Sequence, residues 1–334
     1  MSKVVFFCFH AFHGEQLRTR GLGGIASGTI MLSEALRDLG YEVEVFNSIK
    51  KPKEYEGIKY TPMHKAQKMD VAMAVSNNSA RPLRLIQSGS KAVWQRNRTS
   101  LSRIWKRKEL AQLFTVRPDL VALSDDALEK TPRYIPYRQR HVIPHAIEPA
   151  FLQLDATKFS DRPMRAFFAS RPTRNLKWVI ECWKEYVHKA LPEAELHVCS
   201  PAGTKFPFDI DDLKRHNIIY RGSLQKPELA ELMHSSRLLP YPGHINETGC
   251  QVALQAIGMG VPIVSFGEGS LRDLVLHEQN GYIEKEKAAY ANRMIQCLSD
   301  EDTWQHLHNG AVNHPWRKSY ADRALDWERI FIKN

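Results

Sequence analysis

The stretch Glu247-Thr-Gly-Cys-Gln-Val-Ala-Leu-Gln255 runs on through Ala-Ile-Gly-Met-Gly-Val-Pro262. It predicts a short apolar helix with an acidic residue at its mouth, followed by a small-residue turn and a strand over Pro262–Phe266. The N-terminus of a helix carries unpaired N–H groups and a partial positive charge, so it attracts phosphates and polar sugar hydroxyls. The alternative is that Glu247 only caps an ordinary helix whose apolar residues pack inward.

Strand and helix patterns alternate on both sides of this stretch, which favours parallel, doubly wound α/β sheets. In the first half, a helix is expected over Ser27–Leu39, ended by Gly40. The strands expected there are Val4–Phe9, Glu42–Phe46, Asp70–Val75, Ala92–Trp94, Leu120–Leu123 and His141–Ile143.

A second series of elements begins after the loop at Pro144–Pro149. Helices are expected over Asn175–Ala190 and Pro227–Ser235. The strands expected are Arg165–Ala169, Glu195–Cys199, Ile218–Arg221 and Leu238–Tyr241. With 334 residues, the chain suits two domains.

The quoted stretch resembles the Glu-x7-Glu motif of retaining glycosyltransferases of the GT-B fold, in particular family 4, the glycosyl transferases group 1. In that family the first Glu approaches the donor sugar and the second holds the ribose of the nucleotide. Glu247 matches the first position, whereas Gln255 replaces the second. An amide can still form a hydrogen bond with a ribose hydroxyl.

Other segments extend the resemblance. Arg171 and Lys177 resemble the Arg…Lys pair that stabilises the departing diphosphate, and Arg174 lies between them as an additional cation. The turn Gly21-Leu-Gly-Gly24 resembles the family's Gly-Gly loop and nominates Gly23 and Gly24, while Arg221-Gly-Ser223 resembles the loop that receives the base. The backbone of Thr248, Gly249 and Cys250 is expected to complete the donor site.

The resemblance implies a GT-B α/β fold, with two Rossmann-like doubly wound domains facing a central cleft. It places an acceptor domain at 1–150 and a nucleotide-sugar donor domain at 151–317, with a C-terminal helix at about 318–334 packing back on the first. Transfer with retention would proceed through an oxocarbenium-like state, with Glu247, Arg171 and Lys177 as the catalytic residues and without a metal or other cofactor.

Composition limits the class of protein. The formal net charge is +10, which favours partners rich in phosphate, although solubility alone could explain it. The five cysteines lack C-x-x-C spacing, so no disulfide frame is indicated and a cytoplasmic setting is expected. The apolar run at the N-terminus is interpreted as a buried strand, not a signal peptide, and no stretch approaches the length of a membrane span.

Two further segments leave alternatives open. The run from Trp94 to Lys108 interleaves basic residues with tryptophan, which suits either an anionic membrane surface or a charged helix with its tryptophans in the core. Asp209-Ile-Asp-Asp212 contains a D-x-D pattern, yet it is better explained as the N-cap of a helix than as a metal site.

The sequence therefore predicts a peripheral or cytoplasmic glycosyltransferase. It would move a sugar from a nucleoside diphosphate sugar to a glycan, glycolipid or other hydroxyl acceptor, in the synthesis of cell-surface polysaccharide or lipopolysaccharide. The alternatives are a sugar-nucleotide epimerase of the same fold and a non-catalytic basic binding protein. No RNA- or DNA-binding pattern accompanies the charge, so nucleic acid is not an expected partner. The sugar, the base, the acceptor and the oligomeric state are left open.

Overall fold

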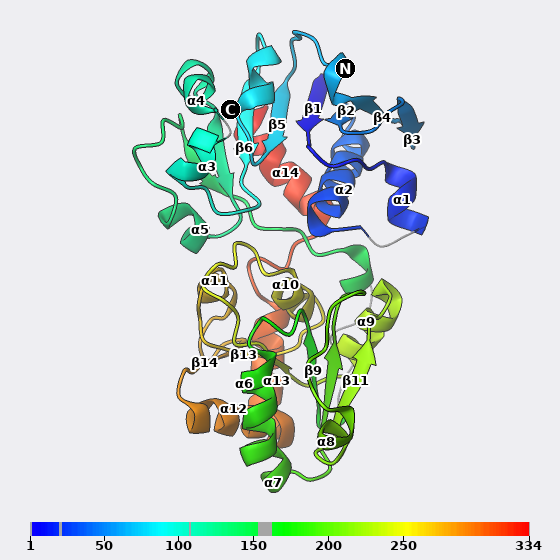
Figure 1. Ribbon diagram of the computed structural model, residues 1–334, viewed down its shortest axis with the longest axis vertical. Coiled ribbons are helices and arrows are strands. Elements are labelled where there is room, and N and C mark those ends of the chain that lie inside the picture. Colours follow the sequence, from blue (N-terminus) through cyan, green and yellow to red (C-terminus); the bar gives the residue numbers. More distant parts are fainter. Residues whose placement is uncertain (1, 20–21, 107, 153–161, 334) are drawn as a thin grey trace. The chain divides into compact units, whose positions relative to one another are not determined.

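The computed structural model describes residues 2–19, 22–106, 108–152 and 162–333. The chain divides into two compact units, which Figure 1 shows in ribbon form. Unit 1 comprises Met1–Ala146 together with Tyr320–Asn334, and unit 2 comprises Ile147–Ser319. Gly21, part of the expected glycine turn, lies outside the described residues.

Unit 1 is built on an eight-stranded sheet in the order β3-β4-β2-β1-β5-β6-β7-β8. All neighbours are parallel except β3 and β4, which form an antiparallel pair at one edge. The strands are β1 (Lys3–Phe7), β2 (Glu42–Asn47), β3 (Lys53–Tyr55), β4 (Ile58–Pro62), β5 (Met73–Asn77), β6 (Ser90–Trp94), β7 (Asp119–Ala122) and β8 (Arg140–Val142). The central strands read as apolar runs because helices cover both faces of the sheet.

The helices of unit 1 come from both ends of the chain. They are α1 (Gly14–Thr19), α2 (Gly24–Asp38), α3 (Leu101–Lys106), α4 (Leu110–Val116), α5 (Asp125–Glu129) and α14 (Tyr320–Phe331), with 3-10 turns η1 (Met63–Lys65) and η2 (Arg81–Leu85). Helix α14, red in Figure 1, lies beside α2. Its Trp327 packs edge-on against Trp94 at 5.4 Å between ring centroids, and Tyr41 donates a 2.7 Å hydrogen bond to Glu328.

Several expected strands of unit 1 differ from the observed strands at their ends, and two of these differences matter for the carboxyl edge of the sheet. The strand expected over Val4–Phe9 ends at Phe7, and Phe9 is 43% exposed. The strand expected over Asp70–Val75 begins at Met73 and continues to Asn77. The edge pair β3 and β4 was missed because its short, charged sequence lacks an apolar run.

Unit 2 contains a parallel sheet in two three-stranded parts, β11-β10-β9 and β12-β13-β14. A parallel bridge between Ala166 and Leu238 joins them, and Phe167 N donates a 3.0 Å hydrogen bond to the Leu238 carbonyl. The strands are β9 (Arg165–Ala169), β10 (Glu195–Cys199), β11 (Ile218–Gly222), β12 (Leu239–Pro240), β13 (Ile263–Ser265) and β14 (Gly281–Ile283). This order is that of a Rossmann sheet, in which ligands bind beyond the carboxyl ends of the strands.

The helices of unit 2 are α6 (Leu176–Cys182), α7 (His188–Ala190), α8 (Ile210–Lys214), α9 (Lys226–His234), α10 (Gln251–Gly258), α11 (Leu271–Leu274), α12 (Lys287–Ser299) and α13 (Glu301–Val312), with the 3-10 turn η3 (Pro149–Phe151). The single helix expected over Asn175–Ala190 is interrupted by a π-helical segment, η4 (Trp183–Val187). Trp183 is fully buried there and donates a 2.9 Å hydrogen bond to the His216 carbonyl.

Candidate active site

A cavity of about 180 Å³ opens at the carboxyl ends of β9, β10 and β11. Ser170, Ser200 and Ser223 each follow one of these strands and line it. Gly222, at the end of β11, has φ +67°, a backbone conformation that glycine adopts without strain and that turns the chain toward Ser223. The cavity therefore offers hydroxyl groups at the edge of the sheet where open α/β folds bind ligands.

Glu247 follows β12 at the same edge, and two side chains from this unit hold its carboxylate. Arg174 Nη1 lies 3.2 Å from Glu247 Oε1, and the Tyr241 hydroxyl donates to the same oxygen at 3.1 Å. Tyr241 also contacts Ser170 Oγ at 3.3 Å, which links Glu247 to the wall of the cavity. Burial raises the pKa of Tyr241, so its hydroxyl stays protonated and remains a donor.

The loop that carries Glu247 is clamped by its own backbone. Glu247 N donates to the His244 carbonyl at 2.9 Å, and the Glu247 carbonyl accepts from Ser270 N at 3.1 Å. Gly269 has φ +61°, and a Cβ there would lie 2.7 Å from the Glu247 carbonyl oxygen. Only glycine lets the two loops approach this closely, so the position of Glu247 is set before any ligand arrives.

Thr248, Gly249 and Cys250 lead into α10, as the sequence predicts. Cys250 is the N-cap residue, and its side chain makes no capping hydrogen bond. Its backbone N–H donates to Ser270 Oγ at 3.0 Å, and burial raises the pKa of its thiol, so Cys250 is not a thiolate nucleophile. Gln255 lies within α10 and is half-buried.

The structure does not bring the two predicted diphosphate ligands to Glu247. Arg171 is exposed and makes no ion pair with the described residues. The side chain of Lys177 is 81% exposed and pairs with Glu181 at 3.8 Å. An exposed pair one helical turn apart contributes only about 0.3–0.5 kcal/mol, so Lys177 can leave Glu181 at little cost. Arg174, which the motif treats as additional, is the cation that contacts Glu247.

Gly23 and Gly24 belong to unit 1, whereas the other predicted site residues belong to unit 2. Gly23 is the N-cap of α2, and a Cβ there would meet no atom within 4 Å, so close packing does not explain this glycine. The Gly24 carbonyl accepts a 2.7 Å hydrogen bond from Arg96. Arg96 also lies over the Trp94 ring at 4.1 Å, and burial lowers its pKa to about 10.

Comparison with known proteins identifies the class of domain that this part of the chain forms. Residues 164–300 match the family model of glycosyl transferases group 1. This segment is a glycosyltransferase domain. No curated protein sequence matches the chain.

Solved structures with the same fold are GT-B glycosyltransferases. Sucrose-phosphate synthase from Thermosynechococcus elongatus has a TM-score of 0.67 at 13% identity, over 99% of this chain and 98% of that chain. HepE of Anabaena, solved with UDP, has a TM-score of 0.67 at 14% identity, over 98% of both chains. AviGT4, a glycosyltransferase of avilamycin A biosynthesis, has a TM-score of 0.61 at 15% identity, over 98% of this chain and 96% of that chain. With this fold and the group 1 domain, the chain is a transferase enzyme.

The D-x-D pattern of the transferase caps a helix, as expected. Asp209 Oδ1 accepts from the backbone N–H groups of Asp211 and Asp212 at the start of α8. Asp212 in turn pairs with Lys184 and Arg215. Within the described residues no three His, Cys, Asp or Glu side chains group in a way that could hold a metal ion.

The basic run of the transferase divides into a buried and an exposed part. Trp94 and Arg96 are buried in unit 1, where Trp94 packs against α14. Trp105, at the end of α3, is 73% exposed, and Lys106 and Lys108 beside it are exposed as well. Trp94 therefore lies in the core, as one of the two alternatives expected for this run, whereas Trp105 does not. No helix in the part of the chain that the structure describes is long and apolar enough to cross a membrane.

Proposed function

We propose that the protein transfers a sugar from a nucleoside diphosphate sugar to a hydroxyl acceptor, with retention of the anomeric configuration. The observation that carries the proposal is the cluster at one sheet edge inside the group 1 domain. The cavity lined by Ser223, the fixed carboxylate of Glu247 and the start of α10 all follow strands of the same parallel sheet. Such an edge is where this type of sheet binds nucleotides.

Each part of the donor has a matching group. At about 180 Å³ the cavity is smaller than a typical ligand pocket, so it suits the base alone. The uncapped first turn of α10 and the exposed Arg171 and Lys177 suit the diphosphate, and Gln255 suits the ribose. HepE has been solved with UDP and with UDP-glucose, which makes uridine the first base to test.

Catalysis would depend on electrostatic stabilisation of the leaving diphosphate. Glu247 forms an ion pair with Arg174 and accepts a hydrogen bond from Tyr241, so its carboxylate is held in one place, where it would contact the hydroxyls of the sugar. The leaving phosphate would accept the proton of the acceptor hydroxyl, and neither a metal nor an enzyme nucleophile is required. Retention is tested by NMR of the product, in which the H1 coupling constant reports the anomer; an inverted product would contradict it.

The proposed setting is the synthesis of cell-surface polysaccharide or lipopolysaccharide at the cytoplasmic face of a membrane. WaaG, a glycosyltransferase of lipopolysaccharide biosynthesis, has the same fold. Trp105 and Phe114, which are 73% and 61% exposed, lie on consecutive short helices near the exposed Lys106 and Lys108. Exposed aromatic and basic side chains together suit an anionic lipid surface.

Thermal unfolding against a panel of UDP-, GDP-, ADP- and dTDP-sugars tests the donor assignment. A ligand at about 100 times its dissociation constant adds about 2.7 kcal/mol of stability, which gives a clear rise in Tm. We expect one nucleotide series to stabilise the protein. If no nucleotide series stabilises the protein, the proposed nucleoside diphosphate sugar donor is rejected.

A further inference from the structure

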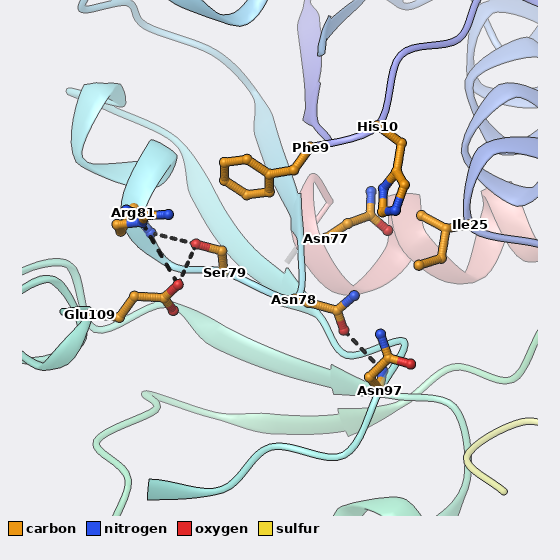
Figure 2. Close-up of a pocket in the computed structure, with 9 residues that line it drawn as sticks. All are labelled: Phe9, His10, Ile25, Asn77, Asn78, Ser79, Arg81, Asn97 and Glu109. Atoms are coloured by element: carbon orange, nitrogen blue, oxygen red, sulfur yellow. Dashed lines mark hydrogen bonds and ion pairs between the residues drawn. The ribbon is translucent and has the colours of Figure 1, made fainter. Parts of the chain in front are cut away.

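Unit 1 has cavities at both edges of its sheet. Figure 2 shows one of about 360 Å³ at the carboxyl edge, where Phe9 follows β1, Asn78 follows β5 and Asn97 follows β6. That edge is where open parallel sheets bind their substrates. Another cavity of unit 1, of about 450 Å³, lies at the opposite, amino edge. It shares no residue with the donor site or with the cavity in Figure 2, so substrate binding does not explain it.

The cavity at the amino edge is lined by the beginnings of four neighbouring strands and by the end of α14. Its residues precede or begin β5 (Val71, Ala72), β6 (Gly89, Ser90, Lys91), β7 (Val116, Arg117) and β8 (Arg138), or end α14 and follow it (Phe331, Ile332). Because β5 to β8 pair in parallel, their amino ends meet at one edge. Ser90 N donates to the Ala72 carbonyl at 3.1 Å, and Arg138 N donates to the Pro118 carbonyl at 3.1 Å. Backbone hydrogen bonds thus hold these loops together.

The charged side chains that line this cavity are Lys91, Arg117 and Arg138, and no aspartate or glutamate that the structure describes is among the lining residues. Lys91 is half-buried and Arg117 is exposed. Neither side chain forms an ion pair or a hydrogen bond with the described part of the chain. Two cations without acidic partners beside one cavity create a positive potential that attracts an anion.

Arg138 is held in place by an acid behind it. Its Nε and Nη2 donate to the two carboxylate oxygens of Asp119 at 2.9 and 2.8 Å. The Asp119 side chain is 2% exposed, whereas that of Arg138 is 58% exposed. A guanidinium group has five N–H donors, so three of them remain for a ligand. Since Asp119 balances Arg138, the charges of Lys91 and Arg117 remain, and together they match a phosphate monoester, which carries about −1.5 to −2 at pH 7.

The backbone of Arg117 also points to a role for its side chain. Arg117 is the C-cap residue of α4, with φ 44° and ψ 57° in the left-handed region. Glycine is the usual residue in this conformation at a helix end, because a side chain makes it less favourable. No hydrogen bond or ion pair of the Arg117 side chain with described residues offsets that cost. A ligand in the cavity that Arg117 lines would do so.

An apolar wall lies beside the cations. Val71 and Phe331 are 8% and 3% exposed, and Val116 is half-buried. A volume of about 450 Å³ is within the range of small-molecule sites, and such sites combine apolar walls with a few charged groups. The lining therefore suits a phosphate attached to a larger apolar or ring-shaped body better than a phosphate ion alone.

We propose that the cavity at the amino edge of unit 1 binds a phosphate monoester. Lys91, Arg117 and Arg138 contact the phosphate oxygens through charge-assisted hydrogen bonds, and Val71 and Phe331 contact the body that carries the phosphate. This chemistry has two sources, a free phosphorylated small molecule and the headgroup of a phospholipid such as phosphatidic acid. The inference is independent of the transfer reaction, since none of these residues belongs to the proposed donor site.

The test is a calorimetric titration of the full chain with phenyl phosphate, inorganic phosphate and phenol. We expect phenyl phosphate to bind at a single site and more tightly than inorganic phosphate, and phenol not to bind measurably. Lys91→Gln and Arg117→Gly should each weaken phenyl phosphate binding about tenfold, the scale of one charge-assisted hydrogen bond. Arg117→Gly should not lower Tm, because glycine adopts the backbone conformation at this position freely. The matched control is Arg84→Gln, since Arg84 is exposed in the same unit but outside the cavity, and it should leave the affinity unchanged.

The proposal is overturned if phenyl phosphate does not bind saturably, or if it binds Lys91→Gln and Arg117→Gly as tightly as the unmodified protein. Loss of binding in Arg171→Ala, with binding kept in Lys91→Gln, would place the ligand in the donor site and also overturn it. Vesicles identify the source of the phosphate. Competition with phenyl phosphate by vesicles containing phosphatidic acid, and not by pure phosphatidylcholine, would indicate a lipid headgroup, and absence of competition a free molecule. Phenyl phosphate binding by a protein that does not bind UDP would keep this cavity and reject the donor site.

Discussion

Arg174 Nη1 lies 3.2 Å from Glu247 Oε1 and so joins the loop after β9 to the loop after β12. The side chains are 33% and 15% exposed, so the pair is only partly screened by solvent. Because Tyr241 donates to the same oxygen, Glu247 is held by two groups of unit 2.

Arg174 should therefore act by positioning Glu247 and not by binding the diphosphate. We expect Arg174→Ala to lower kcat about 10- to 100-fold, since a hydrogen bond to a charged group contributes about 1.5–3 kcal/mol. The dissociation constant for UDP should stay within about twofold of the unmodified value. Kinetics with a UDP-sugar and calorimetry with UDP measure the two quantities. An equal loss in both would assign Arg174 to the diphosphate instead.

Substitution of Arg171 or Lys177 should lower the affinity for UDP as well as turnover, unlike substitution of Arg174. Replacing either with alanine should reduce turnover about 10²–10³-fold and weaken UDP binding, because on the proposed mechanism each substitution removes a charge that would stabilise the leaving diphosphate. Lys214→Ala is the matched control, since the side chain of Lys214 is 68% exposed in the same unit and, among the residues that the structure describes, its ion pair is with Asp211. Variants of Arg171 and Lys177 with the activity of Lys214→Ala would exclude both from the site.

Gln255 should contribute to UDP binding through the ribose. We expect Gln255→Ala to weaken UDP binding about 3- to 10-fold, which is the effect of losing one neutral hydrogen bond. Gln255→Glu should retain UDP binding. Pyrophosphate lacks a ribose, so its affinity should not respond to either change. Competition binding with both ligands checks this, and parallel losses for UDP and pyrophosphate would mean that the helix itself was disturbed.

Trp105 should mediate binding to anionic membranes. Vesicles of phosphatidylglycerol should sediment the protein at low salt, and Trp105→Ala should reduce the bound fraction several-fold. Tyr134→Ala is the control, because Tyr134 is 66% exposed in the same unit and lies outside α3 and α4. Binding should also weaken as salt is added, because salt screens the basic side chains. Equal sedimentation of both variants would argue against a role for this surface.

Asp119 predicts a loss of stability in acid. Burial disfavours its charged form, but hydrogen bonds from Arg138 and the nearby His141, whose Nε2 lies 3.8 Å from Asp119 Oδ2, outweigh this and lower its pKa to about 2 from 3.8. Its ionised form thus stabilises the fold above about pH 4, and this contribution, on the order of 2 kcal/mol, disappears as pH falls toward 2. Asp119→Asn should be less stable in urea at pH 7, with a difference that shrinks below pH 4. A difference independent of pH would contradict this assignment.

Most strands and helices could be predicted because the sequence pattern that indicates them is local. Apolar runs such as Arg165–Ala169 and Glu195–Cys199 became strands at those same residues, since buried parallel strands leave an unmistakable pattern. The ends of strands were less predictable. Whether Phe9 is buried in β1 or exposed beyond it depends on where the neighbouring strands stop, which its own sequence does not encode.

The site was predictable only as far as the motif extends. Glu247 and the residues leading into α10 were nominated because a fixed spacing ties them together. The pairing of Arg174 with Glu247 depends on how two distant loops fold, so the motif selected Arg171 and Lys177 and treated Arg174 as additional. A cavity of unit 1 lined by Phe9, Asn77 and Asn97 was missed because its residues come from several separate elements and share no motif.

The most direct test of the donor site is a calorimetric titration of UDP into the unmodified protein and into Ser223→Trp. The bulky indole should fill the cavity of about 180 Å³ at the ends of β9 to β11. We predict saturable binding to a single site, lost in Ser223→Trp and kept in Lys214→Trp. Equal binding of UDP by Ser223→Trp and the unmodified protein would contradict a nucleotide site at this edge.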